Sequence, residues 1–290
     1  MTNCLATIAQ VNRTAVLTSL LEGSRWERVS WIPSIGSTNS ELMTRARDGA
    51  GLPEILIADE QTAGRGRRGR SWEAPSGSSL MMSLLVHPTS DSAWRGGSSA
   101  AQLTTTALAL GMCEAVRELL GVHVRVKWPN DLVVDPDPAH EGSDDGPGYR
   151  KVAGILAESV VKDGRIVAVV VGVGCNTGWS EIPEEMALKA ASLNLLGDCE
   201  VDRVQLAART VHGFDRRLEL LMAGQTDLVV QEAQEMSATL GRRVRVLEPS
   251  GDAWEGVAES LDGDGRLLVR SSSGIRSLDA ADIEHLRLAP

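Results

Sequence analysis

The sequence lacks the features that would place a chain in a membrane or in a disulfide framework. Its longest apolar runs, such as residues 166–173, are strand-length, whereas a membrane-spanning helix needs about 20 apolar residues. The N-terminus has no charged segment followed by an apolar one, so we expect no signal peptide. No Cys-x-x-Cys pair occurs among the cysteines, which are Cys4, Cys113, Cys175 and Cys199. These absences favour reduced thiols over a disulfide or zinc framework, and they predict a cytoplasmic protein without membrane association.

Basic charge is also scarce, with 29 lysines and arginines against 39 acidic residues and a net charge of −10. Broad binding to nucleic acid or to an anionic membrane needs an extended basic face, so this balance argues against both. No internal repeat is present, and 290 residues suffice for one large domain and a small one.

The exception to this acidic balance is the segment Gly64–Arg70, which reads Gly-Arg-Gly-Arg-Arg-Gly-Arg. Its glycines let the backbone approach a ligand closely, and its guanidinium forks suit a phosphate. A solvated basic loop and an RNA contact are the alternatives. Ordering such a loop costs about 1–2 kcal/mol per residue in backbone entropy, and no apolar residue offsets that cost. We therefore expect a mobile loop that its ligand orders.

Apolar periodicity predicts a chain of mixed helices and strands. An N-terminal helix is expected over residues 4–22, with buried positions Leu5, Ile8, Val16, Leu20 and Leu21. Strands are expected over residues 26–32, 55–58, 80–86, 122–126, 152–161 and 166–173, the last two joined in a hairpin by Lys162-Asp163-Gly164. Helices are expected over residues 98–120, after an Asp202 cap, and over 227–240. From Arg242 onward, short alternating strands predict a small β-barrel.

Three short polar segments stand between these elements. Ser37-Thr38-Asn39 caps the next helix or, with its donors and acceptors, grips a polar uncharged ring. In Lys127-Trp128-Pro129-Asn130-Asp131, proline ends a strand and Asn-Asp favours a tight turn. Residues 135–149 have little apolar content and predict a solvated insertion.

Several motifs, in order and with similar spacing, together resemble the biotin protein ligases. They are Ser37–Asn39, Gln61, Gly64–Arg70, Lys127–Asp131, Arg150–Leu156 and Gly174–Asn176. The resemblance implies an α+β fold, with a central mixed or antiparallel sheet flanked by helices as in class II synthetases. It also implies a helical extension at residues 1–27, a catalytic domain at 28–240 and an SH3-like barrel at 241–290. Residues 1–27 are shorter than the winged helix-turn-helix of some members and are not basic, so we expect a ligase without DNA binding.

The resemblance implies that the enzyme uses ATP to form biotinyl-5′-adenylate and then transfers biotin to a lysine of a carrier protein. The carrier would be the biotin carboxyl carrier domain of an acyl-CoA carboxylase. ATP chemistry implies Mg²⁺, held mainly by phosphates. A lipoate or octanoate ligase and a biotin-sensing regulator are the alternatives. A homodimer stays open, because an exposed sheet edge could serve a second copy or the carrier.

The resemblance also implies roles for individual residues. Biotin would contact Ser37, Thr38, Asn39, Gln61, Arg65, Gly66, Arg67, Lys151 and Gly154. ATP or the adenylate would contact Gly64, Arg65, Arg67, Arg68, Arg70, Trp72, Lys127, Asn130 and Asn176. The catalytic residues would be Lys151, Arg67 and Asp131, the last orienting or deprotonating the incoming lysine. Simpler roles stay open: a strand-end lysine for Lys151, core packing for Trp72 and turn formation for Asn130 and Asp131.

Overall fold

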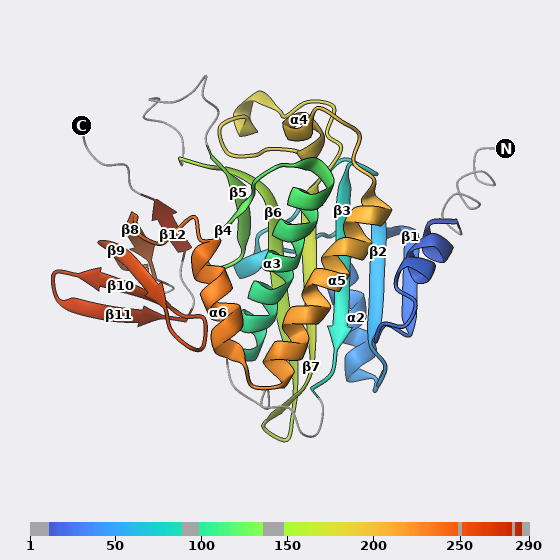
Figure 1. The fold of residues 1–290 in the computed structure, drawn as a ribbon, viewed down its shortest axis with the longest axis horizontal. Helices are drawn as coiled ribbons and strands as arrows, with labels where there is room; N and C mark the ends of the chain where they lie inside the picture. Colours follow the sequence, from blue (N-terminus) through green and yellow to red (C-terminus); the bar gives the residue numbers. More distant parts are fainter. Residues whose placement is uncertain (1–11, 89–98, 136–147, 249–250, 280–281, 286–290) are drawn as a thin grey trace.

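The computed structural model describes residues 12–88, 99–135, 148–248, 251–279 and 282–285. Its main sheet has the strand order β1-β2-β3-β7-β6-β5-β4 (Figure 1). The strands are β1 (Arg28–Ile35), β2 (Glu54–Gln61), β3 (Ser79–Val86), β4 (Arg125–Lys127), β5 (Asp131–Val134), β6 (Arg150–Lys162) and β7 (Arg165–Asn176). The β1–β2 pair is parallel and the other pairs are antiparallel, so the sheet is mixed as expected.

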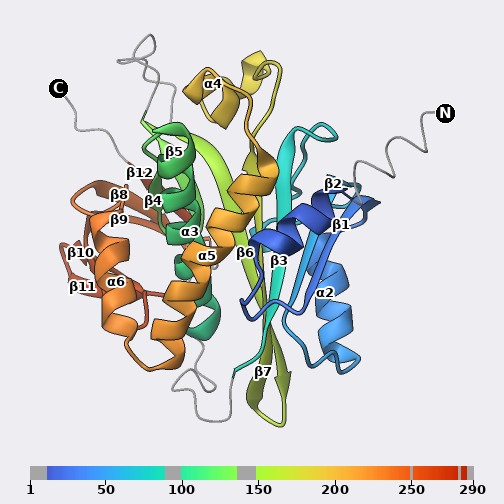
Figure 2. The same cartoon turned by 45° about the vertical axis from the view of Figure 1, so that its right-hand side comes forward.

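Helices cover both faces of this sheet, because alternate strand residues are apolar on both sides. The described helices are α2 (Thr38–Arg47), α3 (Ser99–Leu120), α4 (Leu193–Gly197), α5 (Arg203–Met222) and α6 (Thr226–Glu235), with 3₁₀ turns η1 (Arg67–Gly69) and η3 (Glu184–Met186). Figure 2 shows α3 and α5 on one side of the sheet and α2 on the other. Ile55 and Ile57 belong to the core shared with α3 and α5, whereas Leu56 packs with Leu42 of α2. Helix α2 covers only part of that face, so the rest of it is available for a site.

Several local predictions are confirmed. Ser37 is the N-cap of α2, and Asp202 caps α5 by accepting from the backbone N–H groups of Val204 and Gln205. The β6–β7 hairpin turns at Asp163 and Gly164, which both have positive φ, as a two-residue hairpin turn requires.

The N-terminal helix prediction is partly wrong. Leu17 is fully buried and Leu21 is 3% exposed, whereas Val16 is 41% exposed. The buried stripe therefore runs through Leu17 and Leu21, four residues apart, and the expected stripe through Val16 lies one residue off this face. The described helical residues are 12–20, so the helix ends at Leu20 and before the expected end at 22, and the predictions for Leu5 and Ile8 fall outside the described residues.

Two further elements are shorter than predicted. Strand β4 covers Arg125–Lys127 in place of residues 122–126, and α6 ends at Glu235 in place of 240. The end of α6 has a cause in a contact with β4: the backbone N–H of Val126 donates to Met236 O at 2.9 Å, and the N–H of Ala238 donates to Val126 O at 2.8 Å. Because these groups bond to β4, they are not available to continue the helix.

The C-terminal part forms a separate antiparallel sheet of order β11-β10-β9-β8-β12. Its strands are β8 (Arg243–Leu247), β9 (Ala253–Leu261), β10 (Leu267–Ser271), β11 (Gly274–Leu278) and β12 (Asp282–His285). Trp128 enters the core of this small sheet beside Val244 and Val246, and its indole N–H donates to Gly265 O at 3.0 Å. The two sheets are therefore joined through the turn that follows β4.

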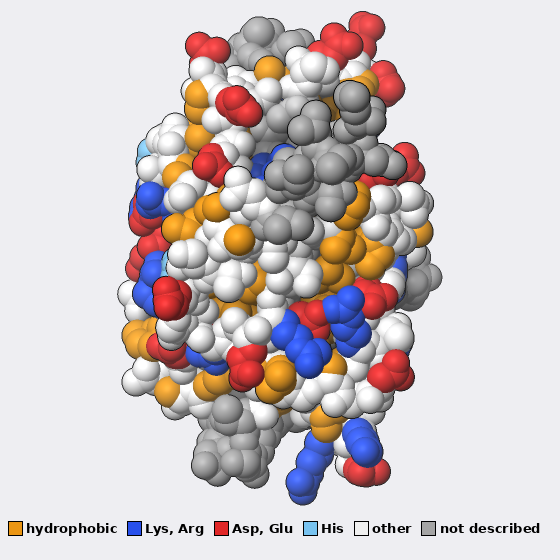
Figure 3. Space-filling view, turned by 90° about the vertical axis from the view of Figure 1, so that its right-hand side faces the viewer, with side chains coloured by type: hydrophobic (Ala, Val, Ile, Leu, Met, Phe, Trp, Pro, Cys, Tyr) orange, Lys and Arg blue, Asp and Glu red, His pale blue; other side chains and the backbone are white. Residues whose placement is uncertain are grey.

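The surface agrees with the charge balance of the sequence. On the face shown in Figure 3, basic and acidic side chains are interspersed, and neither sign covers a broad area. Within the described part of the chain, no helix has both the length and the apolar character needed to cross a bilayer.

Candidate active site

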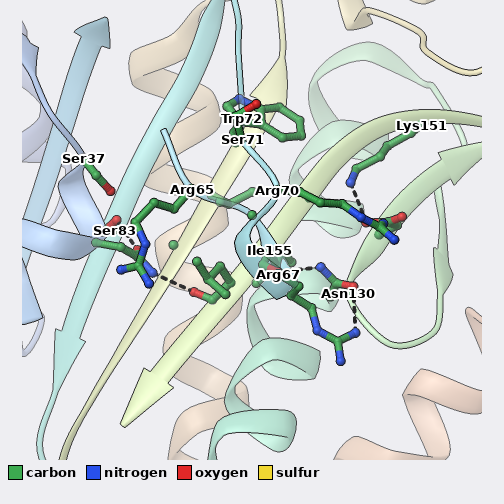
Figure 4. A pocket seen from close by; sticks show the side chains of 18 of the residues that line it. Ser37, Arg65, Arg67, Arg70, Ser71, Trp72, Ser83, Asn130, Lys151 and Ile155 are labelled. Carbon is green, nitrogen blue, oxygen red and sulfur yellow. Dashed lines mark hydrogen bonds and ion pairs between the residues drawn. The ribbon is translucent and has the colours of Figure 1, made fainter. Parts of the chain in front are cut away.

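A cavity of about 330 Å³ lies on the sheet face that α2 leaves uncovered (Figure 4). Segments far apart in the sequence form it. They are the start of α2, the end of β2, the segment Gly64–Arg70 (the arginine segment), the β4–β5 turn, and strands β3, β6 and β7. The predicted residues that line it are Ser37, Thr38, Asn39, Gln61, Arg65, Gly66, Arg67, Arg70, Trp72, Lys127, Asn130, Asp131, Lys151 and Gly154. Gly64, Arg68 and Asn176 are not among the lining residues.

One end of the cavity is a network of uncharged side chains at the N-terminus of α2. Gln61 Oε1 accepts from the backbone N–H of Thr38 at 2.8 Å and from Thr38 Oγ1 at 3.1 Å. Thr38 Oγ1 also lies 2.6 Å from Ser83 Oγ, which donates to Asn39 Oδ1 at 2.6 Å. With Oδ1 engaged by Ser83, the Asn39 amide directs its Nδ2 to Leu156 O at 3.0 Å. These bonds fix the donors and acceptors of the turn in one arrangement.

Gly172 of β7 lies beneath this network, where there is no room for a side chain. A Cβ at Gly172 would lie 2.0 Å from Asn39 Oδ1 and 2.8 Å from Ser83 Oγ. Only glycine lets the polar turn sit directly on the strand at this point.

The arginine segment folds back on itself over the middle of the cavity. The Gly66 N–H donates to Arg70 O at 2.7 Å, and the Trp72 N–H donates to Gly64 O at 3.0 Å. Arg68 has φ 55°, in the left-handed region, at the centre of this turn. The side chains then diverge (Figure 4): Arg65 lies toward Ser83, whereas Arg70 extends toward Lys151.

Trp72 lies flat on a bare patch of sheet made by two paired glycines. Gly154 of β6 and Gly174 of β7 are directly opposite each other. A Cβ at Gly174 would lie 2.5 Å from Trp72 Cε2, and one at Gly154 would lie 2.8 Å from Lys151 Nζ. Trp72 is half-buried and lines the cavity, so core packing alone does not describe its position.

The other end of the cavity carries most of the charge. Lys151 Nζ lies 2.7 Å from Asp131 Oδ1 and 5.4 Å from the centre of the Trp72 ring. Lys127, only 7% exposed, places its Nζ 4.8 Å from the Tyr149 ring centre. Among the described lining residues, Asp131 is the single carboxylate, against the cations Arg65, Arg67, Arg70, Lys127 and Lys151. A cavity with this excess of cations attracts an anionic ligand.

The turn between β4 and β5 presents its polar side chains to this end. Asn130 Nδ2 donates to Ile155 O at 2.8 Å, and Asn130 Oδ1 accepts from Arg67 Nη1 at 3.3 Å. Asn130 thus connects the turn, strand β6 and the arginine segment. The turn-forming role and a role in the cavity therefore coexist in this residue.

Asn176 lies outside the cavity at the end of β7. It is 5% exposed, and its Nδ2 donates to Ala191 O at 3.1 Å. Its Oδ1 and the Trp72 Nε1 are both buried without a hydrogen-bond partner in the described structure.

The residues that sequence reasoning did not assign to this site include a serine, a tyrosine, a leucine and a glutamate with side chains at the cavity or its edge. Ser83, Tyr149 and Leu247 line the cavity, and Glu158 binds Arg65 at its edge. A hydroxyl within the apolar strand Ser79–Val86 was a signal for Ser83, and Tyr149 is the single tyrosine of the chain. No local signal marks Glu158 or Leu247, because strand pairing and the small sheet bring them to the site.

The chain matches two family models. The biotin/lipoate A/B protein ligase family matches residues 32–176, and the biotin protein ligase C terminal domain matches residues 239–286. A biotin--[acetyl-CoA-carboxylase] ligase of Mycobacterium tuberculosis is 33% identical over 91% of both chains. The bifunctional ligase/repressor BirA of Escherichia coli is 30% identical over 93% of this chain and 76% of that protein.

A solved structure shares the fold. It is the biotin protein ligase from Aquifex aeolicus in complex with biotin and ATP, with a TM-score of 0.72 at 22% identity. The match covers 90% of this chain and 100% of that chain. Fold, motif order and sequence identity over nearly the whole length agree, and the chain belongs to the biotin protein ligase branch of the biotin/lipoate A/B protein ligase family.

Proposed function

We propose that this protein is an ATP-dependent biotin protein ligase. It activates biotin as biotinyl-5′-adenylate and transfers the biotinyl group to a lysine of a biotin carboxyl carrier domain. The observation that carries this proposal is the polarity of the cavity, which has a network of uncharged hydrogen-bonding groups at one end and concentrated positive charge at the other. Biotin has the matching polarity, an uncharged ureido ring and a carboxylate tail.

Recognition of the ring falls to Ser37, Thr38, Asn39 and Gln61. The Thr38 N–H and hydroxyl both engage Gln61 Oε1, and Ser83 holds the Asn39 carbonyl oxygen. These groups are therefore ordered by protein contacts, which reduces the entropy that a ligand must pay to order them. A polar ring that replaces or joins these bonds is favoured over an apolar ring, because buried polar groups without partners are costly.

Activation brings two anions together. A biotin carboxylate oxygen attacks the α-phosphorus of ATP, the bond to the β-phosphate oxygen breaks, and pyrophosphate leaves. Two unit charges about 4 Å apart repel by about 4 kcal/mol at an effective dielectric constant of about 20. Lys151, beside Asp131 and next to the Trp72 ring, supplies a positive charge between the two anions, and Arg67 supplies a second. The positive groups stabilise the charge that develops on the phosphorus oxygens.

The nucleotide would occupy the region of Trp72 and Asn176. Buried polar groups normally have partners, and here Trp72 Nε1 and Asn176 Oδ1 have none in the described structure. A donor and an acceptor on the nucleotide would satisfy them. Lys127, Asn130 and Arg70 would then contact the phosphates from the β4–β5 turn and the arginine segment.

Transfer requires an uncharged lysine amine from the carrier. The amine attacks the biotinyl carbonyl carbon, the bond to the phosphate oxygen breaks, and AMP leaves. Asp131, which lines the cavity, would orient this amine and accept its proton. Arg65, Gly66 and Arg67 would cover the adenylate and exclude water, which otherwise hydrolyses the mixed anhydride.

The donor set fits Mg²⁺ that is held mainly by the nucleotide. Mg²⁺ prefers oxygen ligands and commonly binds through phosphates and one or two carboxylates. In the described part of the chain no cluster of three acidic, histidine or cysteine side chains forms a metal site, and Asp131 is the one carboxylate lining the cavity. Asp131 and Asn130 would be its protein contacts, and the ion would reduce the negative charge of the phosphates.

The proposal extends to domain organisation and partners. Residues 28–240 would carry the catalytic domain and residues 241–290 the second domain. The name of the mycobacterial relative supports a carrier domain of an acyl-CoA carboxylase as the acceptor.

The free thiols of Cys113 and Cys175 support a cytoplasmic location. The outer position of β1 in the described sheet supports a homodimer through strand pairing.

Replacing Lys151 with Ala tests the mechanism. We expect biotin-dependent pyrophosphate release from ATP to fall at least about 100-fold, since a charge that stabilises the transition state is lost. The unfolding temperature should change little, because Lys151 is a partly exposed residue. Unchanged pyrophosphate release in the variant would refute the role of Lys151.

Calorimetry with biotin against lipoate separates the ligase proposed here from a lipoate ligase, since preferential binding of lipoate would overturn the ring assignment.

A further inference from the structure

Glu158 of β6 bonds both to the arginine segment and to the polar turn at the start of α2. Its carboxylate accepts both ends of the Arg65 guanidinium, with Nη1 to Oε2 at 3.0 Å and Nη2 to Oε1 at 2.9 Å. The same Oε2 lies 3.3 Å from Asn39 Nδ2. One carboxylate therefore contacts the arginine segment and the polar turn at the start of α2.

The geometry favours a specific interaction over a passing surface contact. A bidentate arginine–carboxylate pair holds the guanidinium in one plane, whereas a single contact leaves it free to rotate. Ser40 Oγ also accepts from Arg65 Nη1, at 3.3 Å, so the guanidinium is held by β6 and α2 together. The Glu158 side chain is 21% exposed and that of Arg65 is 46% exposed, so water reaches the pair and weakens it.

A weak bidentate pair suits a segment that opens and closes. Arg65 and Gly66 both line the cavity, and the backbone of this segment lies over its middle. If the segment were fixed permanently, substrates and the adenylate could not pass. A pair that breaks readily allows opening, whereas its planar geometry returns Arg65 to one position on closing.

We infer that Glu158 is a positioning residue for biotin activation, which holds Arg65 and Asn39 so that the arginine segment closes over an occupied ring site. The inference rests on the proposed ligase function. It assigns Glu158 no contact with the reacting atoms. Its effect is instead on how long the segment stays closed and on how the ring is held.

Glu158→Gln tests this assignment, because the amide keeps the shape but presents N–H groups to the guanidinium. Limited trypsin digestion should cut the variant within residues 64–70 roughly five- to tenfold faster than the parent protein. The KM for biotin in pyrophosphate release should rise by a similar factor, and kcat should stay within about twofold. AMP release without a carrier protein should increase, because an open segment exposes the anhydride to water.

Three further variants make the result decisive. Glu118→Gln removes the carboxylate of a comparable exposed pair, with Arg209 at 2.8 Å, and should change none of these quantities. In an Arg65→Ala background, Glu158→Gln should have little further effect on loop cleavage, because the partner through which it acts is gone. Glu158→Asp, which shortens the side chain, should give an intermediate cleavage rate.

The outcomes separate this inference from the proposed function. Cleavage and KM equal to those of the parent protein in Glu158→Gln would overturn the inference, as would fully additive effects in the double variant. If the parent protein itself releases no pyrophosphate with biotin and ATP, the ligase proposal fails, whereas the trypsin result still decides whether Glu158 holds the segment.

Discussion

The shape of the site depends on two glycines at its centre, just as its electrostatics depend on the charged residues around them. Gly154 and Gly174 face each other on β6 and β7. The Trp72 ring occupies the space that a Cβ at Gly174 would fill, whereas a Cβ at Gly154 would meet Lys151 Nζ at 2.8 Å and Trp72 Cζ3 at 3.2 Å. An aromatic ring cannot bend away from a Cβ, so a small substitution here moves the whole indole. The position of Trp72 therefore depends on the absence of a Cβ at Gly174.

Replacing Gly174 with Ala tests this dependence. The added Cβ would lie 2.5 Å from Trp72 Cε2, which forces the ring off the sheet. We expect kcat/KM for ATP in pyrophosphate release to fall at least about tenfold, because a displacement of about 1 Å in an active site can be very costly. Gly178→Ala is the matched control, since the nearest atom to its Cβ would be Ser78 O at 3.9 Å. Equal kinetics in the two variants would show that Trp72 does not need this position.

The helices behind the sheet depend on glycine in the same way, but for packing alone. Gly111 of α3 meets Gly213 and Phe214 of α5, and a Cβ at Gly111 would lie 2.7 Å from the Phe214 backbone nitrogen. A Cβ at Gly213 would lie 2.8 Å from Gly111 Cα. The two backbones are thus in direct contact, which positions α3 against the strands that form the cavity floor.

Gly111→Ala should therefore destabilise the protein, although alanine is the better helix former. Propensity alone favours alanine by about 1 kcal/mol, whereas overpacking against rigid backbone costs about 1–3 kcal/mol. We expect a net loss in the free energy of unfolding, measured by urea titration. In Gly197→Ala the nearest neighbour of the Cβ is a side-chain sulfur at 3.4 Å, so that variant should be nearly neutral. A stabilised Gly111→Ala protein would contradict the close helix contact.

Ion pairs also link helices α3, α5 and α6. Arg217 is buried and donates to Glu114 Oε2 at 2.9 Å, and it also pairs with Glu232 of α6. Burial is the largest influence on Glu114 and raises the pKa of its carboxyl. Hydrogen bonds and charge from Arg217 and Arg216 outweigh it, so that the pKa is below its ordinary value. The folded state thus favours the carboxylate form of Glu114.

The lowered pKa of Glu114 predicts a pH dependence with a definite sign. A carboxyl whose pKa is lower when folded stabilises the protein above its unfolded pKa, about 4.3, and this stabilisation is lost as pH falls through the folded pKa. Glu114→Gln should therefore unfold at lower urea than the parent protein near neutral pH, and the gap should narrow as pH falls below about 4.3. Glu118→Gln, which removes an exposed pair, should show little gap at any pH. A gap that widens in acid would contradict the prediction.

The elements also show which features sequence reasoning can find. The sequence predicts a cap within Ser37–Asn39 for α2 and at Asp202 for α5, because capping is local: the acceptor oxygen and the N–H groups are within three residues. In the N-terminal helix the pattern predicts the buried Leu21 correctly but selects Val16 over Leu17, because both are apolar and only tertiary contact distinguishes them. The end of α6 depends on a contact with Val126 of β4, more than 100 residues earlier in the chain, and no local signal reports that contact.

At the scale of the whole molecule, the order of the motifs predicts which residues share a cavity. Most of the predicted residues line one cavity, because β2, β3, β7 and β6 are neighbours in the main sheet. Glu158 and Ser83 could not be assigned in this way, since their roles arise from strand register and from contacts with Arg65 and Asn39. Sequence therefore supplies the candidates, and pairing of the strands decides which of them meet.

The small sheet is part of the site as well as a neighbour of it. Leu247 of β8 lines the cavity, and Trp128, between the cavity residues Lys127 and Asn130, is buried in the core of the small sheet. We therefore expect a change inside that core to affect the cavity by two routes, through β8 and through the turn that follows β4. A change at the far end of the main sheet has neither route.

Two leucine truncations separate these routes from a general loss of stability. Leu267→Ala in the small core and Leu17→Ala in the N-terminal helix both remove a fully buried side chain, and each should cost about 2–5 kcal/mol in the free energy of unfolding. Only Leu267→Ala should also raise the KM for biotin or ATP, by roughly threefold or more, when activity is measured where both variants stay folded. If Leu17→Ala raises these KM values equally, the effect follows stability alone. If Leu267→Ala leaves them unchanged, the small sheet does not shape the cavity, and Leu247 lines it without contributing to binding.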